Sequence, residues 1–323
     1  MNTDRVASFT AASAFPLKVI QNRACRNGVG RIIPVHVQFN PTNACNLNCS
    51  FCSCSNRKKT EKMRLEEFQG MIRMFAGLGT KALTITGGGE PMLHPNINEI
   101  IRASVECGVQ VGLVTNGVFA GNLSMARMKF PPKWIRVSVS DDRDVDGLFK
   151  SLLPVISTIG SDWAFSYVLT RAPDYDKLRA IVKFAEDHGF CHVRVVADLF
   201  DIGAVPNMEV VRSELSFSSG EALVIYQGRK EFVLGRASCL ISLLKPVIGP
   251  DGGVWPCCGV QYALNDPSRD LETSMRMGDW RDFPLIMEEQ FAFDGSRCVR
   301  CYYDEYNRVL GMLTVPLEHR EFV

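Results

Sequence analysis

Between residues 33 and about 200, short apolar or alternating runs take turns with longer segments that carry apolar residues on one helical face. The runs predict six strands, over 33–42, 81–88, 109–117, 134–140, 163–170 and 192–200. The longer segments predict amphipathic helices over 65–79, 97–108, 145–157 and 175–189, and a poorer helix candidate lies near 118–129. Alternating strands and helices favour parallel strands joined by right-handed crossovers. We therefore expect an α/β fold with a partial (β/α)6 barrel.

Several of these strands alternate, so that polar side chains share one face. The faces carry His36, Gln38 and Asn40 in the first strand, Arg136, Ser138 and Ser140 in the fourth, and His192, Arg194 and Asp198 in the last. A packed parallel barrel would show near-continuous apolar runs instead. Either the polar faces meet solvent at an edge, or they line a hollow cavity that six strands leave open. For the cavity, candidates that orient a substrate or accept a proton are His36, Arg136, Tyr167 and Arg194.

Beyond residue 206 the alternation stops. A polar segment with a possible helix (207–227) precedes two β-like runs, which a Pro-Asp-Gly-Gly turn at 250–253 separates as in a hairpin. A further helix is expected over 282–292. The pattern predicts an N-terminal extension, a barrel, a linker with a possible helix, a small hairpin-plus-helix domain and a C-terminal tail, over 1–32, 33–206, 207–238, 239–305 and 306–323.

Composition narrows the class of protein. The 323 residues are 46% hydrophobic and 22% charged, which is typical of a globular chain with a sizeable core. The net charge of +1 gives no strong signal for nucleic acid or an anionic membrane. Neither a signal-peptide-like run nor an apolar stretch of membrane-spanning length occurs, so we expect a cytoplasmic protein without a membrane partner.

Twelve cysteines in such a chain favour metal or redox chemistry over disulfides. An early group, Cys45, Cys49, Cys52 and Cys54, follows the first strand directly, at the end where α/β barrels carry chemistry. Zinc sites complete four ligands, but a C-x-C pair in so short a loop is awkward for one tetrahedral centre. A late group comprises Cys239, Cys257, Cys258, Cys298 and Cys301.

The early motif C-x3-C-x-aromatic-C, with Phe51 as its aromatic residue, resembles the cluster motif of the radical S-adenosylmethionine (SAM) superfamily. TGGGEP (86–91), TNG (115–117) and the serine-bearing fourth strand occur in the order found in that family. The resemblance, over about residues 33–200, implies a [4Fe–4S] cluster on three thiolates, with one iron open to the amino and carboxylate groups of SAM. It implies metal ligands Cys45, Cys49 and Cys52, and SAM contacts from Phe51, Gly88, Gly89, Glu90, Asn116, Ser138 and Ser140. An external reductant such as flavodoxin or ferredoxin is implied as a partner.

The late group resembles the auxiliary-cluster extension of the same superfamily. Cys239, Gly252 and Cys257 fit C-x12-G-x4-C, and Cys298 and Cys301 follow. No cysteine follows Cys301, so the two-cluster form called SPASM lacks ligands, and the shortened twitch form, as in 2-deoxy-scyllo-inosamine dehydrogenase, matches better. The resemblance implies one auxiliary [4Fe–4S] cluster on Cys239, Cys257, Cys298 and Cys301. Cys258 is a bystander or substitutes for Cys257, and a structural zinc site is the alternative.

A cluster with four thiolates has no vacant iron, which suits it to electron transfer. The leading hypothesis is therefore a two-electron oxidation of a polar small molecule, such as an aminosugar or nucleoside, with hydrogen abstraction by a 5′-deoxyadenosyl radical. The alternatives are a redox-neutral epimerase, isomerase or mutase, a peptide-modifying enzyme, and a non-catalytic zinc-binding interaction protein. The cysteine order of the molybdenum-cofactor cyclase, C-x2-C-x13-C, is not present, which argues against cyclase activity.

Overall fold

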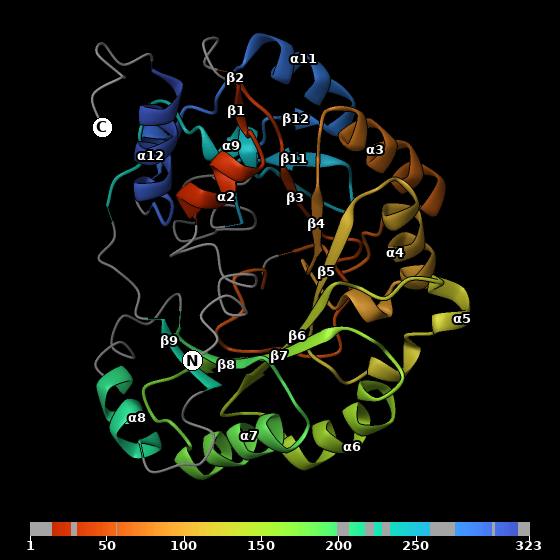
Figure 1. Ribbon diagram of the computed structural model, residues 1–323, viewed down its shortest axis with the longest axis vertical. Helices are drawn as coiled ribbons and strands as arrows, with labels where there is room; N and C mark the ends of the chain where they lie inside the picture. Colours follow the sequence, from red (N-terminus) through yellow and green to blue (C-terminus); the bar gives the residue numbers. More distant parts are fainter. Residues whose placement is uncertain are drawn as a thin grey trace.

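The structure is a computed structural model that describes residues 15–26, 31–55, 57–198, 207–216, 223–227, 233–258, 275–298 and 301–315. Its centre is a ten-stranded sheet in the order β12-β11-β10-β3-β4-β5-β6-β7-β8-β9 (Figure 1). The six predicted strands are β3 (His36–Phe39), β4 (Ala82–Ile85), β5 (Gln110–Thr115), β6 (Trp134–Ser140), β7 (Asp162–Leu169) and β8 (His192–Ala197). They pair in parallel and in sequence order. The predicted α/β barrel-type fold is confirmed.

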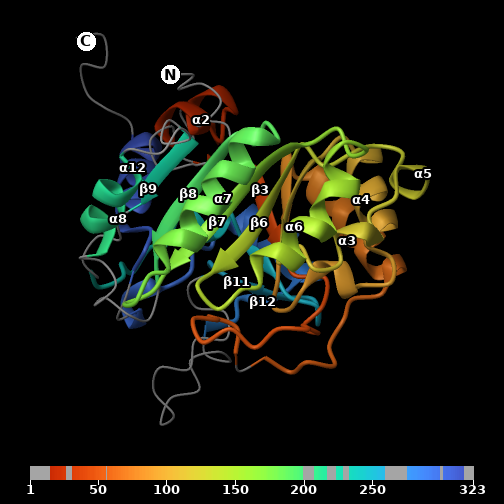
Figure 2. The same cartoon turned by 90° about the horizontal axis from the view of Figure 1, so that it is seen from below.

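Helices cover the outer face of this curved sheet (Figures 1 and 2). The predicted ones are α3 (Leu65–Gly77), α4 (Ile97–Glu106), α6 (Val145–Ile156) and α7 (Tyr175–Asp187). The region near 118–129 forms only the short η2 (Ala120–Asn122) and α5 (Met125–Met128), and η1 (Pro91–Leu93) follows β4. Phe39 of β3 packs on Phe68 of α3 with ring centroids 4.9 Å apart, so the odd positions of β3 face the helices. In the described part of the chain, no helix has the length and apolar character needed to cross a membrane.

The sheet extends further than six strands. The late hairpin is present as β10 (Val247–Ile248) and β11 (Gly253–Trp255), followed by β12 (Gly278–Asp279). However, β10 pairs in parallel with β3, so the hairpin continues the barrel sheet instead of standing apart. The polar segment at 207–227, expected to hold a possible helix, contains the helix α8 (Asn207–Leu215) and also a strand, β9 (Val224–Gln227), which pairs with β8.

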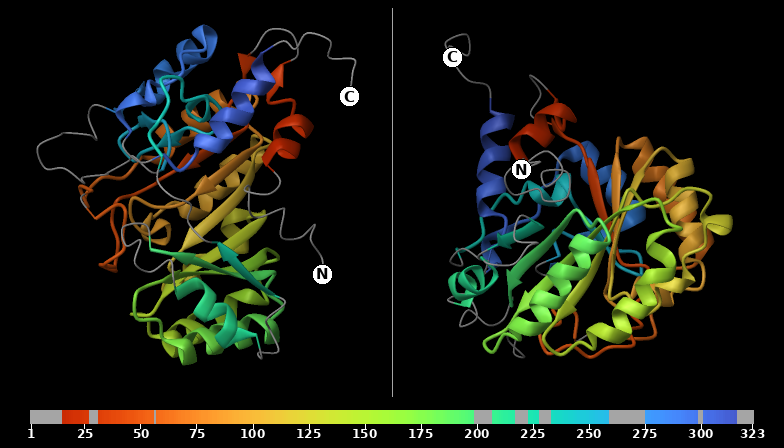
Figure 3. Two further views of the ribbon diagram at one scale, coloured as in Figure 1. Left: turned by 90° about the vertical axis from the view of Figure 1, so that its left-hand side faces the viewer. Right: turned by 60° about the horizontal axis from the view of Figure 1, so that its bottom comes forward.

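Both ends of the described chain pack beside the late cysteines. This region contains α2 (Phe15–Gln21), β1 (Cys25–Arg26), β2 (Arg31–Ile32), α9 (Ile241–Leu244), η5 (Trp280–Asp282), α11 (Phe283–Glu289), η6 (Gly295–Arg297) and α12 (Asp304–Thr314). Phe15 of α2 stacks on Tyr306 of α12 with ring centroids 4.2 Å apart. The two helices, red and dark blue, lie side by side (Figure 3). The first residues of the segment assigned as a tail are therefore a packed helix.

Candidate active site

The loop that carries the early cysteines leaves the carboxyl end of β3 (Figure 2). Cys45, Cys49 and Cys52 are all partly buried in it. Burial is the main cause that raises the pKa of the Cys49 thiol, and Cys52 and Cys45 raise it further. The three thiols therefore lie close enough to one another to interact electrostatically.

A buried arginine that the sequence analysis overlooked holds this loop. Arg57 donates through Nε to the carbonyl of Asn43 (2.8 Å) and through Nη1 to Cys52 Sγ (3.5 Å) and the carbonyl of Cys54. Cys54 itself is buried, and its thiol donates to the carbonyl of Gly87 at 3.6 Å. Burial raises the pKa of Cys54 to about 12, so this thiol stays protonated at neutral pH. A protonated, buried thiol agrees with the expectation that Cys54 is not a fourth ligand.

The glycine-rich loop after β4 lies directly against the cysteine loop. The backbone N–H of Gly89 donates to the carbonyl of Thr42 (2.9 Å), and the backbone N–H of Glu90 donates to the carbonyl of Ala44 (2.7 Å). A Cβ on Gly89 would lie 2.0 Å from the carbonyl oxygen of Ala44. Because that oxygen belongs to the backbone, only glycine allows this approach.

The Glu90 side chain is buried between β4 and β5. Its carboxylate accepts hydrogen bonds from the backbone N–H of Met92 (3.0 Å), the hydroxyl of Thr115 (2.7 Å) and the backbone N–H of Asn116 (2.7 Å). Burial raises its pKa, and the three donors oppose that shift. The Asn116 amide in turn donates to Asn46 Oδ1 at 2.9 Å. The structure thus brings the TGGGEP, TNG and cysteine segments together.

A second arginine missing from the sequence analysis lies at the same place. Arg143 follows β6 and donates through Nη2 to the carbonyl of Asn116 at 2.9 Å. Burial lowers its pKa, while Cys49 and Glu90 act in the opposite direction. Its Nη1 is buried and has no hydrogen-bond partner among the described residues. Such a group is suited to bind a carboxylate that enters between the two loops.

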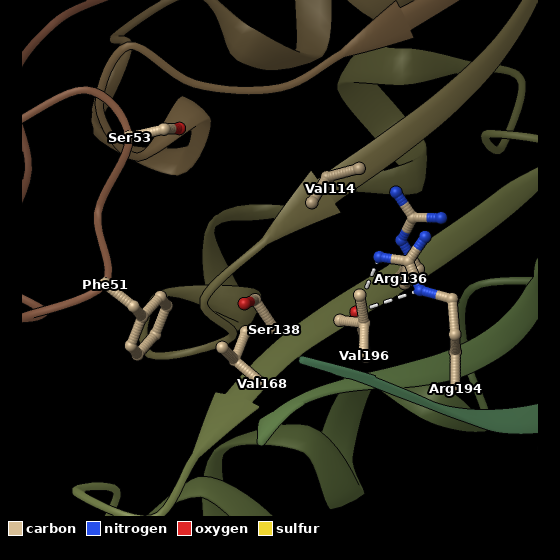
Figure 4. A pocket seen from close by; sticks show the side chains of 9 residues that line it. Phe51, Ser53, Val114, Arg136, Ser138, Val168, Arg194 and Val196 are labelled. Atoms are coloured by element: carbon tan, nitrogen blue, oxygen red, sulfur yellow. Dashed lines mark hydrogen bonds between the residues drawn. The ribbon is translucent and has the colours of Figure 1, made fainter. Parts of the chain in front are cut away.

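A cavity of about 190 Å³ opens inside the barrel beside Phe51 (Figure 4). Its lining consists of Phe51, Ser53, Val114, Arg136, Ser138, Ser166, Val168, Arg194 and Val196. Ser138 pairs in register with Ser166, and Ser166 pairs with Arg194, so these side chains share the inner face of β6, β7 and β8. Arg136 and Arg194, two of the residues expected in a polar cavity, belong to this lining. Ser140, in contrast, is buried and lies outside the cavity lining.

Two candidates do not line this cavity. The prediction for Tyr167 is wrong, because Tyr167 and Phe165 lie on the face of β7 opposite to Ser166, where Phe165 contacts Phe184 of α7. The Tyr167 hydroxyl donates to Asp141. His36 is on the inner face of β3 but bonds to Thr84 Oγ1 at 2.8 Å. Burial, then the positive charges of Lys245 and Lys18, hold the pKa of His36 well below its usual value, so its ring is neutral.

The late cysteines also come together. Burial raises the pKa of Cys239 to about 11, and among its smaller causes are the Cys301 and Cys298 thiols. Cys257 and Cys298 both pack on Met275. Two backbone hydrogen bonds join the loops that carry these cysteines. The N–H of Cys239 donates to the carbonyl of Phe293 (2.9 Å), and the N–H of Cys301 donates to the carbonyl of Val233 (2.7 Å). Cys258 instead contacts the Tyr303 hydroxyl at 3.3 Å.

Comparison with known proteins finds a family model that matches part of the chain. Residues 39–139 match the family described as the Radical SAM superfamily. This part of the chain is similar to a radical SAM domain. Enzymes of this superfamily use a [4Fe–4S] cluster and SAM.

Two relatives resemble parts of the chain in sequence. GTP 3′,8-cyclase of Chlorobaculum tepidum is 26% identical over 167 residues, which are 47% of this chain and 50% of the relative. The subtilosin biosynthesis protein AlbA of Bacillus subtilis is 32% identical over 111 residues, which are 34% of this chain and 25% of AlbA. The chain therefore spans half or less of the length of these curated relatives.

Solved structures share the fold. SuiB of Streptococcus suis bound to S-adenosylmethionine has a TM-score of 0.56 at 16% identity, covering 82% of this chain and 69% of SuiB. anSMEcpe with bound AdoMet and the Kp18Cys peptide has a TM-score of 0.56 at 14% identity, covering 82% of each chain. At these identities the likeness concerns the fold alone.

The donor set suits the cofactors of a radical SAM domain. Within the described ranges, no group of three or more His, Cys, Asp or Glu side chains is gathered closely enough to hold a single metal ion. Each thiolate of a [4Fe–4S] cluster binds a different iron, so its ligands stand farther apart than those of one ion. The early loop offers three soft sulfur donors beside an arginine and a buried glutamate. These residues fit a cluster with an amino-acid moiety next to it.

Proposed function

We propose that this chain is a radical SAM enzyme that abstracts a hydrogen atom from a polar small molecule held in the barrel. Its bound cluster and SAM would supply a 5′-deoxyadenosyl radical after reduction by a flavodoxin- or ferredoxin-type protein. The observation that carries the proposal is the convergence of the early cysteine loop, the Gly89–Glu90 loop and Arg143 beside a polar cavity.

The cofactor contacts follow from this convergence. Cys45, Cys49 and Cys52 would hold the cluster, and Arg57 would keep their loop in shape through its contacts to the backbone. Arg143, whose Nη1 has no hydrogen-bond partner among the described residues, would bind the carboxylate of SAM. Further SAM contacts would come from Phe51, Gly88, Gly89, Glu90, Asn116, Ser138 and Ser140.

The late cysteines would complete the reaction as an oxidation. Cys239, Cys257, Cys298 and Cys301 would hold a saturated cluster that accepts the electron left on the substrate radical, while the substrate loses a proton. Hydrogen-atom abstraction, proton loss and electron transfer together remove two electrons and two protons from the substrate. Residues 239–305 would form this twitch-like part, although β10 joins it to the barrel sheet.

A peptide-modifying enzyme is the second candidate. The similarity to AlbA, a protein named for bacteriocin biosynthesis, favours it. Similarity to GTP 3′,8-cyclases offers a third reading, but the order of the late cysteines differs from that of the cyclase motif.

Anaerobic purification tests the proposal against a zinc-binding interaction protein. We expect a brown protein that absorbs near 400 nm and contains about eight irons per chain. A colourless protein with about two zinc ions per chain would rule out the radical mechanism.

A further inference from the structure

One of the early cysteines accepts a hydrogen bond from a buried charge. Arg57 is 7% exposed, and its Nη1 donates to Cys52 Sγ (3.5 Å) and to the carbonyl of Cys54. Its Nε donates to the carbonyl of Asn43 at 2.8 Å. A guanidinium stays protonated in proteins, so Arg57 places a full positive charge beside the Cys52 sulfur. Because the side chain is buried, salt screens this charge much less than it screens a surface charge.

The surrounding chain fixes the direction of the Arg57 side chain. Its planar guanidinium is held at Nε by the segment that follows β3 and at Nη1 by the cysteine loop. The Asn43 backbone that accepts from Nε is itself held by Glu61. The N–H of Asn43 donates to the carbonyl of Glu61 (2.9 Å), and Asn43 Nδ2 donates to Glu61 Oε2 (3.0 Å). The contact between Arg57 and Cys52 therefore follows from a fixed arrangement of the loop.

Two other cysteines that are expected as ligands accept hydrogen bonds from neutral donors. The backbone N–H of Leu47 donates to Cys45 Sγ at 3.5 Å, and Nδ2 of Asn307 donates to Cys239 Sγ at 3.7 Å. A hydrogen bond from an ionised donor is roughly twice as strong as one from a neutral donor. The charge of Arg57 therefore sets its contact with Cys52 apart from these two.

A cation beside a ligand sulfur favours the reduced state of an iron–sulfur cluster. One-electron reduction adds a negative charge to the cluster, and a positively charged donor stabilises that added charge. Hydrogen bonds to the sulfurs are among the features that set the reduction potential of such clusters. Under the proposed function the early cluster is reduced before SAM is cleaved. A higher potential lets a one-electron reductant of the flavodoxin or ferredoxin class supply the electron more readily.

We propose that Arg57 is a positioning residue that raises the reduction potential of the early cluster through its hydrogen bond to Cys52. The inference rests on the proposed function, because it takes Cys45, Cys49 and Cys52 to hold that cluster. Arg57 holds the loop through backbone carbonyls and acts on the cluster through a sulfur. The two effects can be measured apart, since iron content reports the first and reduction potential reports the second.

The test compares Arg57→Gln with the wild type, using the full chain reconstituted anaerobically with its clusters. Each protein is titrated with dithionite, and electron paramagnetic resonance follows the reduced clusters. Addition of SAM identifies the early cluster, because SAM binds to its open iron and changes its signal. We expect the equilibrium constant for reduction of this cluster to fall about tenfold in Arg57→Gln, which is about 59 mV for a one-electron couple.

Lys58→Gln is the matched control. Lys58 is the next residue and carries the same charge, but its side chain is 84% exposed and lies 3.8 Å from Glu61. Its removal should leave the potential of the early cluster unchanged. Arg57→Lys keeps a charge without the planar fork of nitrogens and should recover part of the shift. Equal potentials in Arg57→Gln and the wild type would show that Arg57 only supports the loop, and would overturn the proposal.

Iron analysis of the same samples keeps the test decisive. If Arg57→Gln holds too little iron to titrate, Arg57→Lys decides in its place. A potential below that of the wild type then supports the proposal, and a potential equal to it overturns the proposal.

The response to SAM separates this inference from the proposed function. A wild-type protein whose signals do not respond to SAM, and that releases no 5′-deoxyadenosine, contradicts the proposed function, and the inference falls with it. A response to SAM together with an unchanged potential in Arg57→Gln overturns the inference alone and leaves the proposed function standing.

Discussion

The carboxylate of Glu90 accepts a 2.7 Å hydrogen bond from the hydroxyl of Thr115, which joins the glycine-rich loop after β4 to the end of β5. Thr115→Val keeps the shape but removes the donor from a buried carboxylate. We expect the free energy of unfolding to fall by about 1–3 kcal/mol and SAM binding to weaken. Urea titration and SAM titration measure the two effects. Thr158→Val, at an exposed position after α6, should change neither the free energy of unfolding nor SAM binding. If the two variants behave alike, the Thr115–Glu90 hydrogen bond does not stabilise the site.

A methyl group at position 89 should disrupt the site. Gly89→Ala would place its Cβ 2.0 Å from the Ala44 carbonyl, so the cysteine loop must move. We expect less than half of the wild-type iron in the reconstituted protein, measured by iron analysis. Gly77→Ala, where the Cβ meets nothing within 4 Å, should keep its iron and gain about 0.5–1 kcal/mol of stability in α3. Full iron content in Gly89→Ala would contradict the close approach.

The sequence was sufficient to predict the strands whose apolar pattern runs over several residues, and the motif-bearing loops that follow them. It was insufficient for the place of β10 in the sheet, because the pairing of β10 with β3 joins chain segments about 200 positions apart. Tyr167 was placed on the wrong face because β7 is buried on both sides, so its sequence WAFSYVL does not alternate clearly.

The site itself was predicted where a motif marks it and missed where it depends on contacts between loops. Arg57 and Arg143 lie in charge-rich stretches, SNRKK and DDRD, which are typical of solvated surface. In the structure, each arginine is held by a hydrogen bond to a backbone carbonyl of another segment. Arg57 donates to Asn43, and Arg143 donates to Asn116. The order of the residues gives no signal of such contacts.

The buried histidine His192 should make stability depend on pH. Burial, then Arg136 and Arg194, lower its pKa to about 4, below the usual value of about 6.5. Between these values the unfolded chain binds a proton that the folded chain does not, so stability is lost as pH falls through this window. The expected slope is up to about 1.4 kcal/mol per pH unit. Urea titrations of the wild type and His192→Gln from pH 7.5 to 5 should converge as pH falls, and parallel profiles would contradict the buried neutral ring.

Removal of the late thiols should separate the two clusters. The double variant Cys298→Ala, Cys301→Ala should lose about four of about eight irons and all net substrate oxidation, but still cleave SAM. Cys107→Ala, a partly buried cysteine after α4, serves as the control and should keep its full iron content. Normal oxidation by the double variant would exclude an electron-accepting role for the late cysteines.

The central claim is that Cys45, Cys49 and Cys52 hold the cluster at which SAM is cleaved. Its most direct measurement is the amount of 5′-deoxyadenosine formed when the anaerobically reconstituted protein is mixed with SAM and dithionite. We predict release of 5′-deoxyadenosine and methionine by the wild type and by Cys54→Ala, and none by Cys49→Ala. Failure of the wild type to cleave SAM, or cleavage by Cys49→Ala at the wild-type rate, would contradict it.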